Sequence, residues 1–344
     1  MHSNQFSCKT DVGDGTTALF IMKKIYVLLV CSLSLFLFSC RTTEFVYTEV
    51  SVPEEGTFIF EKITDETIEK VGAPSIDNNG RDHITFNAHR TMAVSPDGKM
   101  LYYLAVSNKQ VNVYRKDLSS KNIQTQRTFR SNVNNISVSP DGEKLCFSEI
   151  SGDYSLLYQT DASVGSIVRQ LSTQNVKDSH PYYQKDGNKI FFDRSGAIWS
   201  YDLQNGQVVN YCRGYQPYPL NDEEFLCYRE STNRGEIWKV NFVTGHESVI
   251  VSLDERWFIT PSLSPDGQWI LMAGNTIPNG NMEEENVDIY VVKTDGTNLT
   301  QLTYHKGHDI CPVWSADGKY IYFLSQRGTE TGDYNIWKMN FNLK

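Results

Sequence analysis

A short hairpin recurs six times along this chain and constrains its fold more than any other feature. Each copy is an apolar strand, a tight turn and a second apolar strand, and the clearest is Thr260 to Leu271, TPSLSPDGQWIL. The other copies are MAVSPDGKMLYY at 92–103, ISVSPDGEKLCF at 136–147, PYYQKDGNKIFF at 181–192, PYPLNDEEFLCY at 217–228 and PVWSADGKYIYF at 312–323. Proline presets the first central position of such a turn, and Asp and Gly tolerate the conformations that close it.

The spacing of the turns indicates a repeat architecture. The turn aspartates or their equivalents are Asp97, Asp141, Asp186, Asp222, Asp266 and Asp317, which are separated by 44, 45, 36, 44 and 51 residues. An aliphatic-aromatic pair follows every turn, as in Ile237-Trp238 and Ile336-Trp337. Four short strands in each period of roughly 40 to 45 residues are typical of a β-propeller blade. The sequence therefore predicts an all-β, six-bladed β-propeller over residues 57–344.

The last repeat lacks its outermost strand, because its third strand, Tyr334 to Phe341, runs almost to Lys344. Thr57 to Thr64, TFIFEKIT, has the β-branched and aromatic content of a strand. We expect this N-terminal strand to complete the sixth blade and close the ring, which would remove an exposed sheet edge.

The first forty residues have the pattern of a secretory signal. Met22-Lys23-Lys24 precedes an apolar run, Ile25 to Phe38, that ends at Ser39-Cys40. LFSC at 37–40 resembles the bacterial lipobox, in which the signal is cut before a cysteine that then carries lipid. We expect residues 1–40 to be this signal, with 1–21 preceding a better start at Met22, and 41–56 to be a tether from a membrane anchor at Cys40.

The net charge and the cysteines limit which classes of partner and which kinds of site are expected. The formal net charge of −9 argues against nucleic acid, whose phosphates require basic patches, and fits a soluble monomer. Cys146 and Cys227 fall inside apolar strands, and no cysteine spacing matches a zinc site. An oxidising compartment would permit a disulfide between Cys212 and Cys227, although the sequence gives no reason to require one.

The hairpins, the Ile-Trp or Ile-Tyr strands and the segment NLTQLT at 298–303 resemble the WD-repeat-like propeller repeats of TolB and its relatives. The resemblance covers about residues 57–344. Many such repeats occur in envelope lipoproteins of Bacteroidetes, so it implies an outer-membrane lipoprotein with an envelope protein or peptide as partner. Few acidic residues directly follow Cys40, which resembles lipoproteins that face the periplasm. Because the repeat also occurs in peptidase propeller domains and sugar lyases, it is specific for fold rather than for function.

A binding site is expected where loops meet at one mouth of the central channel. Thr91, Asn135, His180, Gln216, Thr260 and Cys311 each lie six residues before a turn aspartate, so the repeat predicts a ring at one height. The neighbouring loops add Arg256, Trp257, His308 and Asp309. These polar residues suit a peptide end, a sugar or a metal, but polar residues at strand starts often cap backbone groups or hold channel water instead.

Signals of catalysis are absent from the sequence. It has no Gly-x-Ser-x-Gly elbow and no Gly-rich phosphate loop. The prediction is therefore a non-catalytic binding or scaffolding module without a cofactor or resident metal. The alternative is a metal-assisted glycan lyase of the oligogalacturonate type, for which His89, His180 and His308 are the candidate metal ligands, although their positions relative to the turns differ.

Overall fold

The computed structural model describes residues 50, 53, 57–64, 70–71, 90–107, 110–120, 124–128, 132–163, 169–173, 175–276, 286–328 and 334–343. All of them belong to one compact unit, Phe45–Lys344. Every regular element in these ranges is a β-strand, and none of the described residues forms a helix suited to crossing a membrane. The expected signal, the lipobox at Cys40 and all of the tether but Val50 and Pro53 lie outside the described residues.

The strands form successive antiparallel sheets. The first contains β2 (Lys70–Val71), β3 (Met92–Val94), β4 (Met100–Ser107), β5 (Gln110–Asp117) and β6 (Gln124–Gln126). The second contains β7 (Val133–Val138), β8 (Lys144–Ser151), β9 (Tyr154–Asp161) and β10 (Arg169–Gln170). The third contains β11 (Asp178–Tyr183), β12 (Lys189–Arg194), β13 (Ala197–Asp202) and β14 (Val208–Arg213).

The remaining strands form two further sheets. One holds two groups of four strands, which are joined by a single parallel pair, Gly235 with Trp257. Each such group of consecutive antiparallel strands, here and in the other sheets, is called a unit below. Its strands are β15 (Tyr215–Pro219), β16 (Glu224–Ser231), β17 (Arg234–Asn241), β18 (Glu247–Val251), β19 (Arg256–Leu263), β20 (Trp269–Thr276), β21 (Asn286–Lys293) and β22 (Thr300–Gln301). The other contains β23 (Asp309–Trp314), β24 (Tyr320–Ser325), β25 (Asn335–Asn340) and β1 (Phe60–Lys62).

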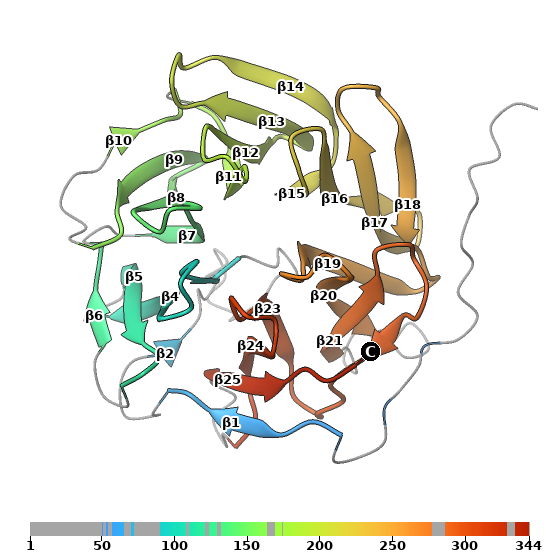
Figure 1. The fold of residues 1–344 in the computed structure, drawn as a ribbon. Helices are drawn as coiled ribbons and strands as arrows, with labels where there is room; N and C mark the ends of the chain where they lie inside the picture. The colour runs from blue at the N-terminus through green and yellow to red at the C-terminus, as the bar shows by residue number, and fades with distance from the viewer. Residues whose placement is uncertain are drawn as a thin grey trace, which may run out of the picture. The chain divides into compact units, whose positions relative to one another are not determined.

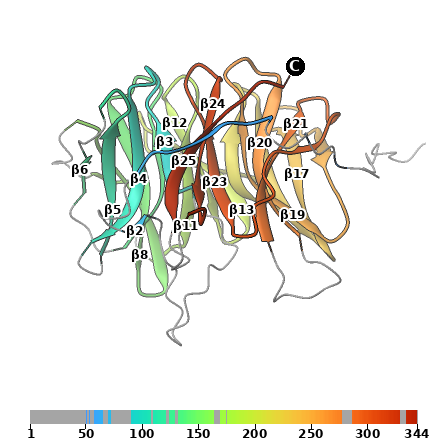
Figure 2. The same cartoon turned by 90° about the horizontal axis from the view of Figure 1, so that it is seen from below.

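The sheets follow one another around a common centre, and β7, β11, β15, β19 and β23 lie nearest to it (Figure 1). Seen at right angles, the strands run up and down (Figure 2). The short strand β1 lies within the segment expected to be the N-terminal strand, and it pairs antiparallel with β25, Phe60 opposite Met339. The last sheet therefore takes its outer strand from the N-terminal part of the chain.

The turns between the first two strands of a unit are built by local hydrogen bonds. In the first, Ser95 Oγ donates to Asp97 Oδ1 at 2.5 Å, and the backbone N–H of Met100 donates to Ser95 Oγ at 2.9 Å. Gly98 follows with a φ of 71°, a left-handed conformation that glycine adopts without steric cost. The turns at 139–142, 264–267 and 315–318 repeat these bonds.

Turns from different units also touch. A Cβ placed on Gly142 would lie 3.3 Å from Pro96 Cδ, and one on Gly98 would lie 3.3 Å from Ala316 Cβ. The second turn therefore packs on the first, and the first packs on the turn before β24. A side chain at either glycine must displace its neighbour.

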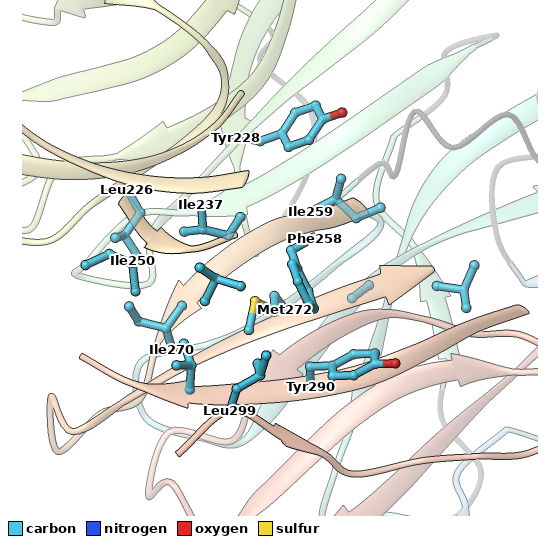
Figure 3. Packing of buried hydrophobic residues seen from close by; sticks show 14 residues of the cluster. Leu226, Tyr228, Ile237, Ile250, Phe258, Ile259, Ile270, Met272, Tyr290 and Leu299 are labelled. Atoms are coloured by element: carbon cyan, nitrogen blue, oxygen red, sulfur yellow. The ribbon is translucent and has the colours of Figure 1, made fainter. Parts of the chain in front are cut away.

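The apolar side chains pack mainly between neighbouring units. In the cluster of Figure 3, residues from β16 to β18 meet residues from β19 to β21, and the ring of Phe258 lies edge-on to that of Tyr290 with 5.4 Å between their centroids. Both rings are fully buried. Burying one such side chain stabilises the fold by about 1.5–3 kcal/mol, so contact between units is the main source of stability.

Turn packing can be tested with two matched glycine variants. Gly142 and Gly267 share the same turn position and nearly the same φ, 76° and 75°, but a Cβ at Gly267 meets nothing within 4 Å. We expect each change to alanine to cost about 1–2 kcal/mol for the left-handed backbone. Gly142→Ala should cost more than Gly267→Ala in urea unfolding, because it also displaces Pro96. Equal losses would show that the turns do not support one another.

Candidate functional site

The residues expected to form a ring share an unusual backbone conformation. Five of the six have a positive φ: Asn135 at 51°, His180 at 50°, Gln216 at 55°, Thr260 at 54° and Cys311 at 55°. At each of these positions the register of the inner strand against the next strand is interrupted by a bulge. The left-handed conformation costs about 1–2 kcal/mol for a residue with a Cβ. Its recurrence therefore points to a shared constraint on the inner strands.

Hydrogen bonds made by the bulged residues explain part of this constraint. Gln216 Oε1 accepts from the backbone N–H of Thr260 at 2.6 Å, and Asn135 Oδ1 accepts from that of Arg90 at 2.7 Å. Asp193 Oδ2 lies 2.7 Å from His180 Nδ1 and accepts from the N–H of Gln216 at 2.9 Å. The bulged residues thus join one inner strand to another, as capping of backbone groups requires. Asp193, on β12, was not among the predicted site residues.

Arg90 is the second residue that the sequence did not reveal. Its guanidinium donates to the carbonyl oxygens of Pro217 at 2.7 Å, Gln216 at 3.0 Å and Pro261 at 3.1 Å. It also lies 4.8 Å from the ring centroid of Tyr182 and 5.7 Å from that of Tyr218. Since Arg90 precedes β3 and its acceptors belong to β15 and β19, the side chain spans the centre of the molecule.

Arg90 is a buried cation held mainly by neutral groups. The residue is 7% exposed, and burial lowers the pKa of its guanidinium. No carboxylate among the described residues forms an ion pair with it. Carbonyl dipoles and two aromatic faces therefore provide most of its stabilisation, and the negative charge of Asp193 adds to it.

A cavity of about 350 Å³ lies beside Arg90. Its wall takes residues from β3, β7, β11, β15, β19 and β23, the innermost strands of their units. It reaches from Arg90 and Thr260 at one end to the turn residues Pro96, Pro265 and Ala316 at the other. The volume lies within the ordinary range for pockets that bind small molecules.

Most of the predicted mouth residues do not line the cavity. Of the nine predicted ligand-binding residues, Thr260 lines the cavity, whereas Arg256 and Trp257 begin β19 at the end remote from its turn. Thr91, Asn135, His180 and Gln216 are buried in or near the inner strands without lining the cavity. Cys311 lines it.

His308 and Asp309 make contacts of their own at the start of β23. Asp309 is fully buried, and its Oδ2 pairs with Arg327 Nη2 at 2.6 Å. His308 Nδ1 accepts from the backbone N–H of Val287 at 3.3 Å, and burial lowers the pKa of this imidazole. These residues tie β23 to its neighbours, at the opposite end of the strand from the cavity.

The alternative metal ligands are His89, His180 and His308. His89 lies outside the described residues. Among the residues that are described, no group of three or more His, Cys, Asp or Glu side chains is arranged to hold a metal ion. Cys212 and Cys227, the possible disulfide partners, are both free thiols.

Asp288, on β21, lies close to Asp309. Its carboxylate accepts from Gln301 Nε2 at 3.1 Å and from Thr303 Oγ1 at 3.2 Å. Burial, with the nearby negative charge of Asp309, raises the pKa of Asp288 to about 7. This end of the molecule therefore contains a carboxyl group that titrates near neutrality.

The raised pKa of Asp288 predicts a pH-dependent stability. The folded protein holds this proton more tightly than the unfolded chain, whose pKa is 3.8. The resulting stability is present at low pH and is lost as the pH rises through about 7. Between pH 5 and pH 8 the loss is about 2–3 kcal/mol. In urea unfolding at the two pH values, Asp288→Asn should reduce the pH difference by about this amount.

The exposed Asp153 provides a control, because Asp153→Asn changes the same chemical group without burial. If Asp288→Asn and Asp153→Asn alter the pH difference equally, the environment proposed for Asp288 is wrong.

Comparisons with known proteins identify relatives that share this fold. Residues 75–275 match the family described as TolB beta propeller domain. Over 67 residues the chain is 33% identical to Dipeptidyl-peptidase 5 of Porphyromonas gingivalis, a stretch that is 20% of this chain and 10% of that protein. The chain thus spans only a small part of the length of this curated relative.

Two solved structures are also similar. TolB from Acinetobacter baumannii superposes with a TM-score of 0.54 at 24% identity, over 65% of this chain and 56% of that one. An oligogalacturonate lyase in complex with manganese superposes with a TM-score of 0.51 at 14% identity, over 74% of this chain and 89% of that one. At these identities the likeness shows the fold alone.

Proposed function

Since the chain belongs to the TolB beta propeller domain family, we propose that it is a non-catalytic binding or scaffolding module of the cell envelope. Its ligand, a protein, a peptide or a small molecule, enters the central channel. The cavity beside Arg90 carries this proposal, because six inner strands converge on it and leave a space of about 350 Å³.

We also propose that the propeller has six blades. Contacts between the first and last units support this, since Met92 and Tyr103 share a buried cluster with Tyr322 and Ile336. The turns provide further support, because Gly98 faces Ala316.

Completion of the sixth blade by β1 closes the ring in this proposal. The pairing of β1 with β25 supports it, as do two side-chain contacts of β1. Arg327 lies 3.9 Å from the ring centroid of Phe60, and Lys338 pairs with Glu61 at 2.7 Å.

The proposed location follows from the N-terminal sequence. Lipid attached to Cys40 would hold the propeller at the outer membrane, facing the periplasm, as a monomer. The partner would then be an envelope protein or peptide, or a small molecule of that compartment. Nucleic acid is not expected, given the net charge of −9.

Lyase activity is a weaker candidate. The similarity to the manganese-bound oligogalacturonate lyase is one of fold, and the described residues provide no cluster of three metal ligands. A direct assay with oligogalacturonate, with added manganese, separates the two functions. Formation of an unsaturated product would overturn the binding proposal.

Site-specific photo-crosslinking tests whether a ligand occupies the channel in the living cell. A photoreactive amino acid in place of Ser262, in the cavity wall, should give a defined adduct in the native envelope. The same amino acid in place of Val243, which is 66% exposed on a turn away from the cavity, should not give that adduct. An adduct of equal yield at both positions, or none at position 262, would contradict a ligand in the channel.

A further inference from the structure

The charged side chains among the described residues that line the cavity all have the same sign. Arg90 at its inner end and Lys185 beside the turn side are cationic. No Asp or Glu is among the described residues that line it, although the whole chain is acidic. The nearby turn carboxylates are engaged in their own turns, as Asp97 is with Ser95. The cavity therefore differs in sign from the surface around it.

The guanidinium of Arg90 has donors to spare. Arginine carries five N–H donors, and three bonds go to carbonyl oxygens on the far wall of the channel. Among the described residues, no other acceptor is bonded to it. The negative charge of Asp193 acts on Arg90 without a bond between them. A buried cation without a bonded anion is costly, and a carboxylate fits a guanidinium well. Occupation of the cavity by an anion would remove that cost.

The remainder of the wall is mainly apolar. Val138, Leu263 and Trp314 line it, together with Ser137 and Ser262, whose hydroxyl oxygens are buried rather than open to the cavity. A volume of about 350 Å³ equals that of roughly a dozen water molecules, at ~30 Å³ each. The space thus suits an apolar group carrying one or two polar atoms.

We propose that the cavity binds a carboxylate attached to an apolar group, with the carboxylate on Arg90 and the apolar group against Leu263 and Trp314. Lys185 attracts the anion at the turn side. The same chemistry is found in a small organic acid and in the C-terminal residue of a peptide. This inference rests on the proposed use of the channel for binding, and it names the class of ligand.

Calorimetric titration of the intact processed protein tests the charge. The probes are N-acetyl-phenylalanine and its neutral primary amide, which differ only at the carboxyl group. The acid should bind at least 10-fold more tightly than the amide, and its affinity should fall as salt is added. Equal affinity of the two, or binding of the amide alone, would overturn the inference.

Variants locate the site. Lys185→Gln should weaken binding of the acid at least 3-fold, whereas Lys306→Gln, at an exposed lysine remote from the cavity, should not. Arg90→Met should abolish binding. Because that change also removes three bonds to carbonyl groups, Ser262→Trp provides a second variant that fills the cavity and leaves Arg90 in place. Undiminished binding to Ser262→Trp would overturn the inference.

A longer probe distinguishes the two sources of carboxylate. If N-acetyl-glycyl-glycyl-phenylalanine binds more tightly than N-acetyl-phenylalanine, the ligand is a peptide C-terminus, and equal affinity indicates a small acid. A different result separates the inference from the proposed function. If no carboxylate probe binds, but neutral compounds bind and Ser262→Trp prevents their binding, the inference is overturned and the proposed function stands. The proposed function fails separately, through the absence of a channel adduct at position 262.

Discussion

The centre of this molecule depends on a buried guanidinium. Arg90 lies outside the regular strands, yet its side chain reaches across the centre of the molecule to carbonyl groups on β15 and β19. The inner strands line a cavity beside it. Arg90 gives that cavity a cationic inner end. The rest of the proposed function follows from this placement.

The bulges of the inner strands make the arrangement possible. A carbonyl in a regular ladder is bonded to the neighbouring strand, and a bulge interrupts that ladder. Gln216 lies at such a bulge, and its carbonyl oxygen is one of the acceptors of Arg90. Pro261 follows the bulged Thr260 and provides another. The cost of the left-handed backbone is thus associated with the groups that hold Arg90.

The sequence was informative wherever the cause of structure is local. Ser-Pro-Asp-Gly turns are recognisable because Ser95 and Asp97 make their bonds within five residues. The repeat also placed Asn135 and Thr260 at equivalent positions, and the structure gives both the same left-handed backbone. The recurring hairpin established the propeller fold for the same reason.

Features that depend on distant residues could not be predicted. No other repeat has an arginine at the position of Arg90, and its acceptors are more than a hundred residues away in sequence. The pKa of Asp288 depends on burial and on Asp309, which belongs to another unit. The predicted ring overlaps the cavity at Thr260 and Cys311 only, because sequence equivalence gives the height of a residue along its strand but not which residues enclose a space.

Residue-resolved hydrogen exchange in the native protein and in Arg90→Met tests the central claim most directly. The account predicts that the amides of Gln216 and Thr260, which belong to the hydrogen-bonded centre beside Arg90, exchange at least 10-fold faster in the variant. Amides of β9, far from Arg90 in the second sheet, should be unchanged. Identical exchange at Gln216 and Thr260 in the two proteins, or equal acceleration throughout the molecule, would contradict the claim that Arg90 holds the centre together.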